Sequence, residues 1–280
     1  MTQINNQIEI TGIILAGGSS TRFGFNKLEV RIKKVPLFID QVFKLSFFCR
    51  NVLLVTSAKN RPILVRELKK IKHYQSFYGL NFFDIPHISV IEDEKINQEE
   101  YNRSEKSGVK KSTGFQTNVP AGPIAGLYSG LKNSTSLYNI VIAFDMPLIS
   151  KNIFELLLSA LDGIKDISGQ HLNKGLSKKP YDAVIVKTFK GYEALCGLYS
   201  KNCTGALSEN ISAGIYRISD VFRQLNVKIV LLNPEINKKI DSLNFFNINS
   251  IQDYYSFTDT WNGSFSGLDF AGKWEKFFYR

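Results

Sequence analysis

The sequence predicts an α/β fold, in which a mostly parallel, twisted sheet carries helices on both faces. Short apolar runs rich in β-branched residues recur along the chain, and segments with helical spacing separate them. Strands that alternate with helices form parallel sheets, because each helix returns the chain across one face. With 280 residues, of which 44% are hydrophobic, the chain can build the core of a single Rossmann-like domain.

The first elements follow this alternation. Residues 8–15 and 51–56 are apolar runs with many β-branched residues, and we interpret both as buried strands. Between them, 28–32 is a short segment that ends at Lys33-Lys34. Pro36 then precedes the segment 37–45, whose apolar residues have near-helical spacing. A strand, a helix and a second strand are therefore expected in this order.

The next stretch is expected to contain a helix, a loop and a third strand. Pro62 suits the first turn of a helix, which we expect over 63–71. Residues 73–86 are rich in aromatic residues but show no period, so we interpret them as a loop. The apolar run 88–91 predicts the third strand.

Two polar segments interrupt the rest of the chain. Residues 95–119 and 162–180 contain few large apolar residues, which is typical of a lid or a disordered insert. We expect one domain over 1–257 with these two inserts, and a C-terminal extension, 258–280, without a clear element. The other expected elements are helices at 124–131, 152–161, 204–211 and 219–225, strands at 139–144, 182–186, 195–199 and 227–232, and a turn with a short helix at 245–257.

Composition narrows the classes of function. The formal net charge of +10 suits polyanionic ligands, but the lysines are spread along the chain, which favours a solvated basic surface over a nucleic-acid-binding face. The three cysteines lack a Cys-x-x-Cys spacing and the histidines lie far apart, so we expect neither a disulfide framework nor a metal site built from them. We see no signal peptide and no apolar run of membrane-spanning length, and therefore expect a cytoplasmic protein without a membrane partner.

The loop after the first strand is the strongest functional feature of the sequence. The strand ends in Leu15-Ala16-Gly17-Gly18, and the loop then carries Arg22 and Lys27. Glycines let backbone N–H groups turn inward around an anion, and the two cations add charge. The spacing fits neither the Walker pattern nor the dinucleotide fingerprint. It resembles the signature Leu-Ala-Gly-Gly-x-Ser-x-Arg-x-Gly-x-x-Lys of nucleotidyltransferases that join an NTP to a phosphorylated acceptor.

Asp145 is a second candidate. It follows the most apolar strand, 139–144, and precedes Met146-Pro147. In an open α/β sheet, ligands bind outside the carboxyl ends of the strands, so Asp145 and the glycine loop are expected at the same edge. Mg²⁺ takes one or two carboxylates together with phosphate oxygens, and we therefore expect Asp145 to bind Mg²⁺. A role as the cap of the helix 152–161 does not fit the spacing.

Three glycines lie at the expected helix 124–131. Gly122-Pro123 precedes the helix, and proline is natural at a first helical position. Gly126 and Gly130 are about one turn apart, so one face of the helix carries no side chains there. Such a face allows close packing on the sheet and also the approach of a flat nucleobase, and both interpretations can hold together.

The motifs Gly-Gly-x-Ser-x-Arg, Gly-Pro-Ile-Ala-Gly and Asp-Met-Pro occur here in the order that resembles the molybdenum cofactor guanylyltransferase family. Asn247-Ile248-Asn249-Ser250, followed by Gln252-Asp253, is similar to the closing Asn-x-Asn-Thr-Pro-Glu-Asp motif of that family. The resemblance covers most of 8–257 and implies a nucleotide-diphospho-sugar-transferase-like fold. Two positions depart from the pattern: Asn26 stands where the family usually has Asp, and Glu193-Ala194 where it often has His-Pro.

The resemblance also implies roles for single residues. Asn60 is similar to an asparagine near the base, Asp93 to an aspartate at the guanine or ribose, and Asn247 and Asn249 would face the pterin side of the acceptor. The catalytic residues would be Arg22, Lys27 and Asp145, with Asp145 as the metal ligand. The nucleotide-binding residues would be Leu15, Ala16, Gly17, Gly18, Lys27, Asn60, Asp93, Gly122 and Asp145.

The implied reaction is the Mg²⁺-dependent transfer of GMP from GTP to the terminal phosphate of a molybdopterin-type cofactor, with release of pyrophosphate. The attacking phosphate is already an anion, so no general base is required, and Arg22 and Lys27 would neutralise the departing pyrophosphate. One alternative is a cytidylyltransferase that acts on molybdopterin or on a sugar or polyol phosphate. Another is a non-catalytic NTP-binding protein. The sequence predicts no nucleic-acid partner and leaves the oligomeric state open.

Overall fold

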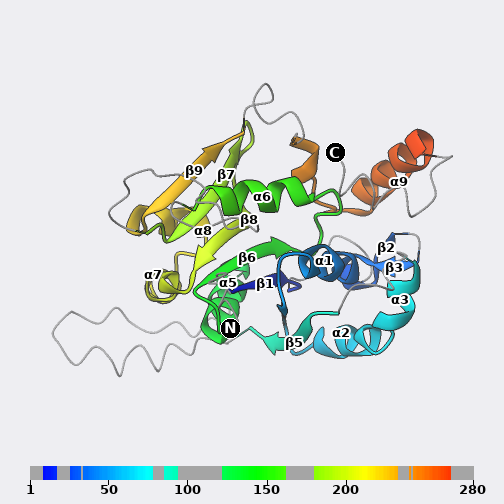
Figure 1. Cartoon of the computed structure of the whole chain (residues 1–280), viewed down its shortest axis with the longest axis horizontal. Coiled ribbons are helices and arrows are strands. Elements are labelled where there is room, and N and C mark those ends of the chain that lie inside the picture. Colours follow the sequence, from blue (N-terminus) through cyan, green and yellow to red (C-terminus); the bar gives the residue numbers. More distant parts are fainter. Residues whose placement is uncertain are drawn as a thin grey trace, which may run out of the picture.

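The computed structural model describes residues 9–17, 26–32, 34–77, 85–93, 122–161, 180–232, 240 and 242–265. Its centre is a seven-stranded sheet in the order β5-β4-β1-β6-β8-β7-β9 (Figure 1). These strands are β1 (Ile10–Leu15), β4 (Asn51–Thr56), β5 (His87–Glu92), β6 (Tyr138–Ala143), β7 (Ala183–Thr188), β8 (Gly191–Ser200) and β9 (Val227–Leu231). A separate two-stranded sheet consists of β2 (Arg31–Ile32) and β3 (Val35–Pro36).

The direction of the strands brings several loops to one edge. β1 is parallel to β4 and β6, and β4 is parallel to β5, so the carboxyl ends of these four strands meet. At that edge Leu15 pairs with both Val55 and Ala143. β8 runs antiparallel between β6 and β7. The expected mostly parallel sheet is therefore confirmed, with β8 as its antiparallel member.

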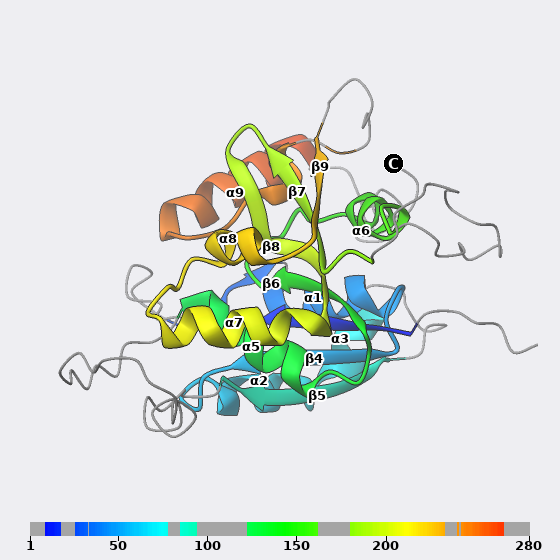
Figure 2. The same cartoon turned by 90° about the vertical axis from the view of Figure 1, so that its left-hand side faces the viewer.

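Helices cover both faces of this sheet (Figures 1 and 2). On one face, α1 (Leu37–Ser46) and α6 (Lys151–Ser159) contribute to the apolar cluster that contains Ile14. On the other face, α5 (Gly122–Asn133) and α7 (Thr204–Ser212) lie side by side and contribute to the cluster that contains Ile13. Successive residues of a strand point to opposite faces, so β1, which is buried along its whole length, supplies both clusters.

The described ranges contain further α-helices and several short 3-10 helices. None of the helices in the described ranges is long and apolar enough to cross a lipid bilayer. The remaining α-helices are α2 (Arg61–Leu68), α3 (Ile71–Phe77), α8 (Ile218–Val221) and α9 (Ile251–Phe265), and the 3-10 helices are η1 (Lys27–Glu29), η2 (Lys201–Cys203), η3 (Phe222–Gln224) and η4 (Ser242–Phe245).

Two local expectations are wrong. The expected loop 73–86 begins inside α3, because Tyr74 is buried and packs into the core. The segment expected to lack a clear element from 258 onward begins inside α9, which continues to Phe265. Phe257 is buried there and stacks on Phe246, which fixes the helix to the domain. The seven larger strands are all present. The segment 95–119 and nearly all of 162–180 lie outside the described residues.

Candidate active site

Several expected site residues lie at the carboxyl ends of neighbouring parallel strands. Leu15 is the last residue of β1, and the backbone N–H of Ala16 donates to Val55 O at 2.8 Å, which continues the pairing beyond the strand. Strand order and direction therefore gather these residues at one edge. Gly17 follows β1, Asn60 lies in the turn after β4, Asp93 follows β5 and Asp145 follows β6.

Lys27 connects the loop after β1 with two other parts of the chain. Its Nζ forms an ion pair with Asp145 Oδ2 and also donates to Asn249 Oδ1 at 3.3 Å. The backbone N–H of Ile248 donates to Asp145 O at 3.0 Å. The side chains of Lys27 and Asp145 are 13% and 15% exposed, so the pair is shielded but still within reach of a ligand. Lys27, Asp145 and Asn249 thus form one contact group.

Asp145 has one carboxylate oxygen that the described residues leave unused. Oδ1 is buried and accepts no hydrogen bond from them. A buried anionic oxygen without a donor is costly unless a cation or a water contacts it. Mg²⁺ takes one or two carboxylates plus phosphate oxygens, so this donor fits it. No cluster of three or more His, Cys, Asp or Glu occurs in the described ranges. A metal at Asp145 would therefore take some of its ligands from a bound substrate.

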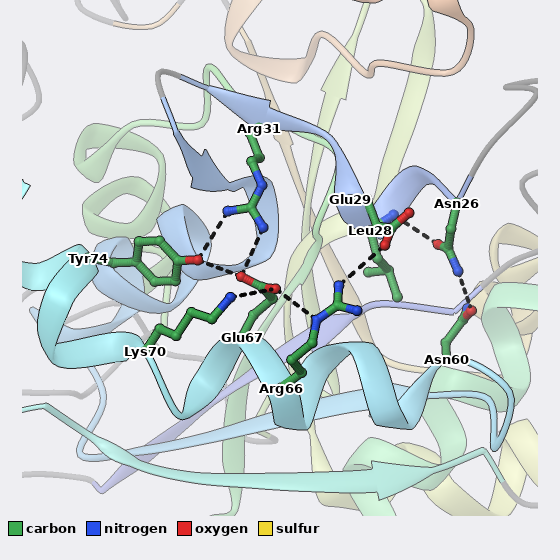
Figure 3. Close-up of polar contacts among 9 residues, drawn as sticks. All are labelled: Asn26, Leu28, Glu29, Arg31, Asn60, Arg66, Glu67, Lys70 and Tyr74. Atoms are coloured by element: carbon green, nitrogen blue, oxygen red, sulfur yellow. Dashed lines mark hydrogen bonds and ion pairs between the residues drawn. The ribbon is translucent and has the colours of Figure 1, made fainter.

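Asn26 joins the loop after β1 to the loop after β4 (Figure 3). Its Oδ1 accepts a hydrogen bond from the Leu28 backbone N–H at 3.0 Å and thereby caps η1. Its Nδ2 therefore faces Asn60, and it donates to Asn60 Oδ1 at 2.8 Å. Asn60 is buried, and its amide nitrogen has no partner among the described residues. The residue that departs from the family pattern thus orients Asn60 so that an N–H donor is left for a ligand.

Asp93 lies close to the backbone of Gly17. A Cβ atom on Gly17 would come within 3.3 Å of Asp93 Oδ2, so a side chain there would crowd this carboxylate. Burial raises the pKa of Asp93, the charge of Glu92 acts in the same direction, and a backbone hydrogen bond opposes both. Its Oδ1 is buried and has no partner among the described residues. Asp93 can therefore accept a hydrogen bond from a ligand hydroxyl or N–H.

The glycine face of α5 serves packing. A Cβ atom on Gly130 would lie 2.7 Å from Ile13 Cγ2, and one on Gly126 would lie 3.3 Å from Leu15 Cδ2. This face rests on β1 at Gly126 and Gly130, which confirms the packing interpretation. The approach of a nucleobase to this helix stays a prediction. Gly122 begins α5 with a φ of 62°, and the space at its Cβ position is open. Gly122 is therefore exposed, about one helical turn before Gly126.

Among the described residues, Asn247 is an expected site residue that does not join this contact group. Asn247 Nδ2 donates to Phe245 O at 3.1 Å, which is a bond within its own segment. Gly18 and Arg22 lie outside the described residues, and their expected roles stay predictions.

Two polar residues of α1 contact the Asp145 loop and were not among the expected site residues. Gln41 Nε2 donates to Met146 O at 3.0 Å, and Lys44 Nζ donates to Pro147 O at 2.8 Å. Both side chains are buried. A signal for them exists in the sequence, because polar residues inside an otherwise apolar helix need buried partners.

A buried carboxylate on α2 holds the segment that carries Lys27 (Figure 3). Glu67 is 2% exposed and accepts hydrogen bonds from Arg31, Arg66 and Tyr74. Arg66 also pairs with Glu29 of η1 at 3.2 Å. Burial acts to raise the pKa of Glu67, but the hydrogen bonds from Tyr74 and the two arginines outweigh it and lower the pKa to about 2. The cluster ties α2 to η1 and β2, the two elements that follow the loop after β1.

The chain is similar to known proteins in sequence and in fold. The family model described as a MobA-like NTP transferase domain matches residues 12–80 and 97–229. A curated relative from Clostridium perfringens (strain 13 / Type A), named "Probable molybdenum cofactor guanylyltransferase", is 27% identical over 250 residues, which cover 88% of this chain and 95% of the relative.

Two solved structures share the fold. The molybdopterin-guanine dinucleotide biosynthesis protein A from Archaeoglobus fulgidus has a TM-score of 0.52 and 21% identity, over 87% of this chain and 94% of that one. The 4-diphosphocytidyl-2C-methyl-D-erythritol synthase from Anaerococcus prevotii DSM 20548 has a TM-score of 0.50 and 15% identity, over 88% and 92%. Proteins named for different nucleobases therefore have this fold, so the fold by itself does not select the base.

Proposed function

This chain belongs to the family of MobA-like NTP transferase domains, and from this premise we propose that it transfers GMP from GTP to the terminal phosphate of a molybdopterin-type acceptor and releases pyrophosphate. The observation that carries the proposal is the contact group of Lys27, Asp145 and Asn249 at the carboxyl edge of the sheet. It joins the phosphate loop, the candidate metal ligand and the acceptor-side segment. The name of the relative from Clostridium perfringens supports the choice of substrates.

Lys27 would bind the phosphates of GTP. Its ammonium is a rotatable point charge on a flexible stem, so it can exchange the Asp145 carboxylate for a phosphate oxygen. Gly17 has no side chain, so its backbone N–H could approach the phosphates closely. A side chain at this position would also crowd the Asp93 carboxylate. Mg²⁺ held by Asp145 Oδ1 would supply further neutralisation of phosphate charge.

The nucleoside would lie against Asn60 and Asp93. Asn60 offers an amide N–H, since its oxygen accepts from Asn26, and Asp93 offers a carboxylate oxygen. One donor and one acceptor suit a guanine, which presents O6 beside N–H groups. Asp93 could equally accept from the ribose hydroxyls.

The acceptor would approach from the side of Asn249, which is exposed and contacts Lys27. The terminal phosphate of the acceptor is an anion at neutral pH and attacks without a general base. The residues here therefore act by positioning the two phosphates and by neutralising charge, which are the main sources of rate in phosphoryl transfer. Arg22 would assist Lys27 on the departing pyrophosphate.

The test is pyrophosphate release by the full chain with a molybdopterin-type acceptor, Mg²⁺ and each NTP in turn. We expect release with GTP and its loss when EDTA removes the metal. A clear preference for CTP would instead identify the cytidylyltransferase alternative. GTP binding without pyrophosphate release would identify a non-catalytic NTP-binding protein.

A further inference from the structure

The backbone of the loop that carries Asp145 accepts hydrogen bonds from several other parts of the chain. Four consecutive carbonyl groups, from Asp145 to Leu148, each accept a hydrogen bond from another part of the chain. The donors are Ile248 N–H to Asp145 O at 3.0 Å, Gln41 Nε2 to Met146 O at 3.0 Å, Lys44 Nζ to Pro147 O at 2.8 Å and Asn244 Nδ2 to Leu148 O at 2.8 Å.

These donors come from two separate segments. Gln41 and Lys44 belong to α1, and Lys44 is fixed by a salt bridge to Asp40 at 2.8 Å. Asn244 and Ile248 belong to the stretch 242–249, which ends at the Lys27 contact of Asn249. The loop is therefore held from the core and from the acceptor side at the same time.

Held carbonyls fix the orientation of the peptide planes. The plane after Asp145 is set by Ile248, and the next plane is set by Gln41. On the other side, the Phe144 N–H donates to Leu15 O at 3.2 Å. The backbone on both sides of Asp145 therefore has one orientation, and its carboxylate starts from a fixed Cα position.

We propose that Gln41 and Asn244 are positioning residues that set the Asp145 carboxylate for the metal and the phosphates. This inference rests on the proposed function of the site. A displacement of about 1 Å at a catalytic group can cost about 100-fold in rate, so a loop held on both sides is a direct means of keeping that group in place.

A substitution at Gln41 allows an effect on positioning to be measured apart from an effect on stability. It is fully buried, yet its Oε1 has no hydrogen-bond partner among the described residues. A buried unpaired acceptor destabilises a fold, so replacement by an apolar side chain of similar shape removes that cost along with the donor. Met146 O also accepts from the Ile149 N–H at 3.3 Å and would not be left unpaired. Gln41→Met is therefore expected to fold with near-normal stability.

The experiment compares the wild type with Gln41→Met, Asn244→Ala and the control Asn210→Leu. Asn210 is also a buried amide, but it donates to Ala206 O and Gln224 Oε1, both at 2.8 Å, within the α7 region on the opposite face. Three quantities are measured: the melting temperature, the GTP dissociation constant with Mg²⁺ and with EDTA, and the split between kcat and KM for pyrophosphate release.

We expect Gln41→Met and Asn244→Ala to lower kcat about tenfold and to weaken the Mg²⁺-dependent gain in GTP affinity, so that KM for GTP rises together with the dissociation constant measured with Mg²⁺. The GTP dissociation constant measured with EDTA should stay at the wild-type value. Asn210→Leu should lower only the melting temperature. If both loop variants keep the wild-type kcat and the wild-type Mg²⁺ gain, the inference is overturned, whatever their melting temperatures. A wild type that binds GTP but releases no pyrophosphate would instead refute the proposed function, and the Mg²⁺ gain would still decide the inference. Asn244→Ala carries the test if Gln41→Met fails to fold.

Discussion

Lys27 and Asp145 are 118 residues apart in the sequence, yet Nζ of the lysine forms an ion pair with Oδ2 of the aspartate. The contact joins the loop after β1 to the loop after β6, two strands that are neighbours in the sheet. Because the two strands are parallel, both loops leave the same edge of the sheet. The pairing of β1 with β6 therefore brings Lys27 to Asp145. The two partners can be changed separately.

Asp145→Asn removes the carboxylate with little change in shape. We expect Mg²⁺-dependent turnover to fall by about 100-fold or more, because a neutral amide is a weaker ligand for a hard divalent cation. The melting temperature should change by less than about 4 °C, since the loop backbone stays held and no buried volume is lost. Turnover at several Mg²⁺ concentrations and thermal unfolding check both points. Normal turnover would show that Asp145 is not the metal ligand.

Lys27→Met keeps most of the aliphatic stem and removes the charge. We expect GTP to bind about 10- to 100-fold more weakly, because hydrogen bonds to charged groups contribute about 1.5–3 kcal/mol. Calorimetric titration with GTP and Mg²⁺ measures this. Lys27→Arg is the matched variant, because it restores the charge with a different shape and should recover part of the affinity. Equal GTP affinity in the methionine variant would contradict the phosphate role.

Asn26→Asp tests the departure from the family pattern. The new carboxylate can still accept from the Leu28 N–H, and the Asn60 amide can turn to donate one of its two N–H groups to it. We therefore expect stability close to wild type and a GTP affinity within about threefold. Asn26→Leu breaks both contacts and should lower the affinity and the melting temperature together. An aspartate variant as weak as the leucine variant would refute this explanation.

Glu67→Gln tests the buried cluster on α2 through its pH dependence. The pKa of Glu67 is lowered from 4.5 to about 2 in the folded chain. The ionised carboxylate therefore stabilises the fold fully above about pH 4.5, and this contribution is lost as the pH falls toward about 2. At about pH 7 the variant should unfold at a lower urea concentration than the wild type, and this difference should shrink at about pH 3.

Glu29→Gln is the control for that series. Glu29 pairs with the same Arg66, but its side chain is 44% exposed. Exposed ion pairs contribute about 0–1 kcal/mol, so this variant should unfold like the wild type at each pH. If the difference between Glu67→Gln and the wild type is the same at both pH values, the ionised carboxylate is not what stabilises the cluster.

The positions of Gly17 and Asp145 were predictable from the sequence, because they depend on the order and direction of the strands. A glycine loop after one buried strand and Asp145 after another reach the same edge of any parallel sheet. The same reasoning could not tell how the Gly126 face is used, because a helix without side chains on one face fits a sheet and a ligand equally well. The contact with Leu15 shows that the face packs on the sheet.

The supporting contacts were not predictable from local patterns. Gln41 and Met146 are 105 residues apart, and a glutamine in an apolar helix does not reveal which carbonyl it meets. The helix α3 was missed for a related reason. Tyr74 is buried because its hydroxyl reaches Glu67, a tertiary contact that overrides the weak local preference of an aromatic-rich segment.

The antiparallel strand β8 has a consequence for how the chain assembles on the ribosome. β1, β4, β5 and β6 have all been synthesised once Ala143 has emerged, but one side of β6 stays unpaired until Gly191–Ser200 is made. β6 is apolar and fully buried in the finished sheet, and unpaired edges of such strands promote association between nascent chains. A chain cut before β8 would carry Lys27 and Asp145 but would leave this edge open. The last third of the chain therefore protects the nascent half-sheet from self-association as well as completing the sheet.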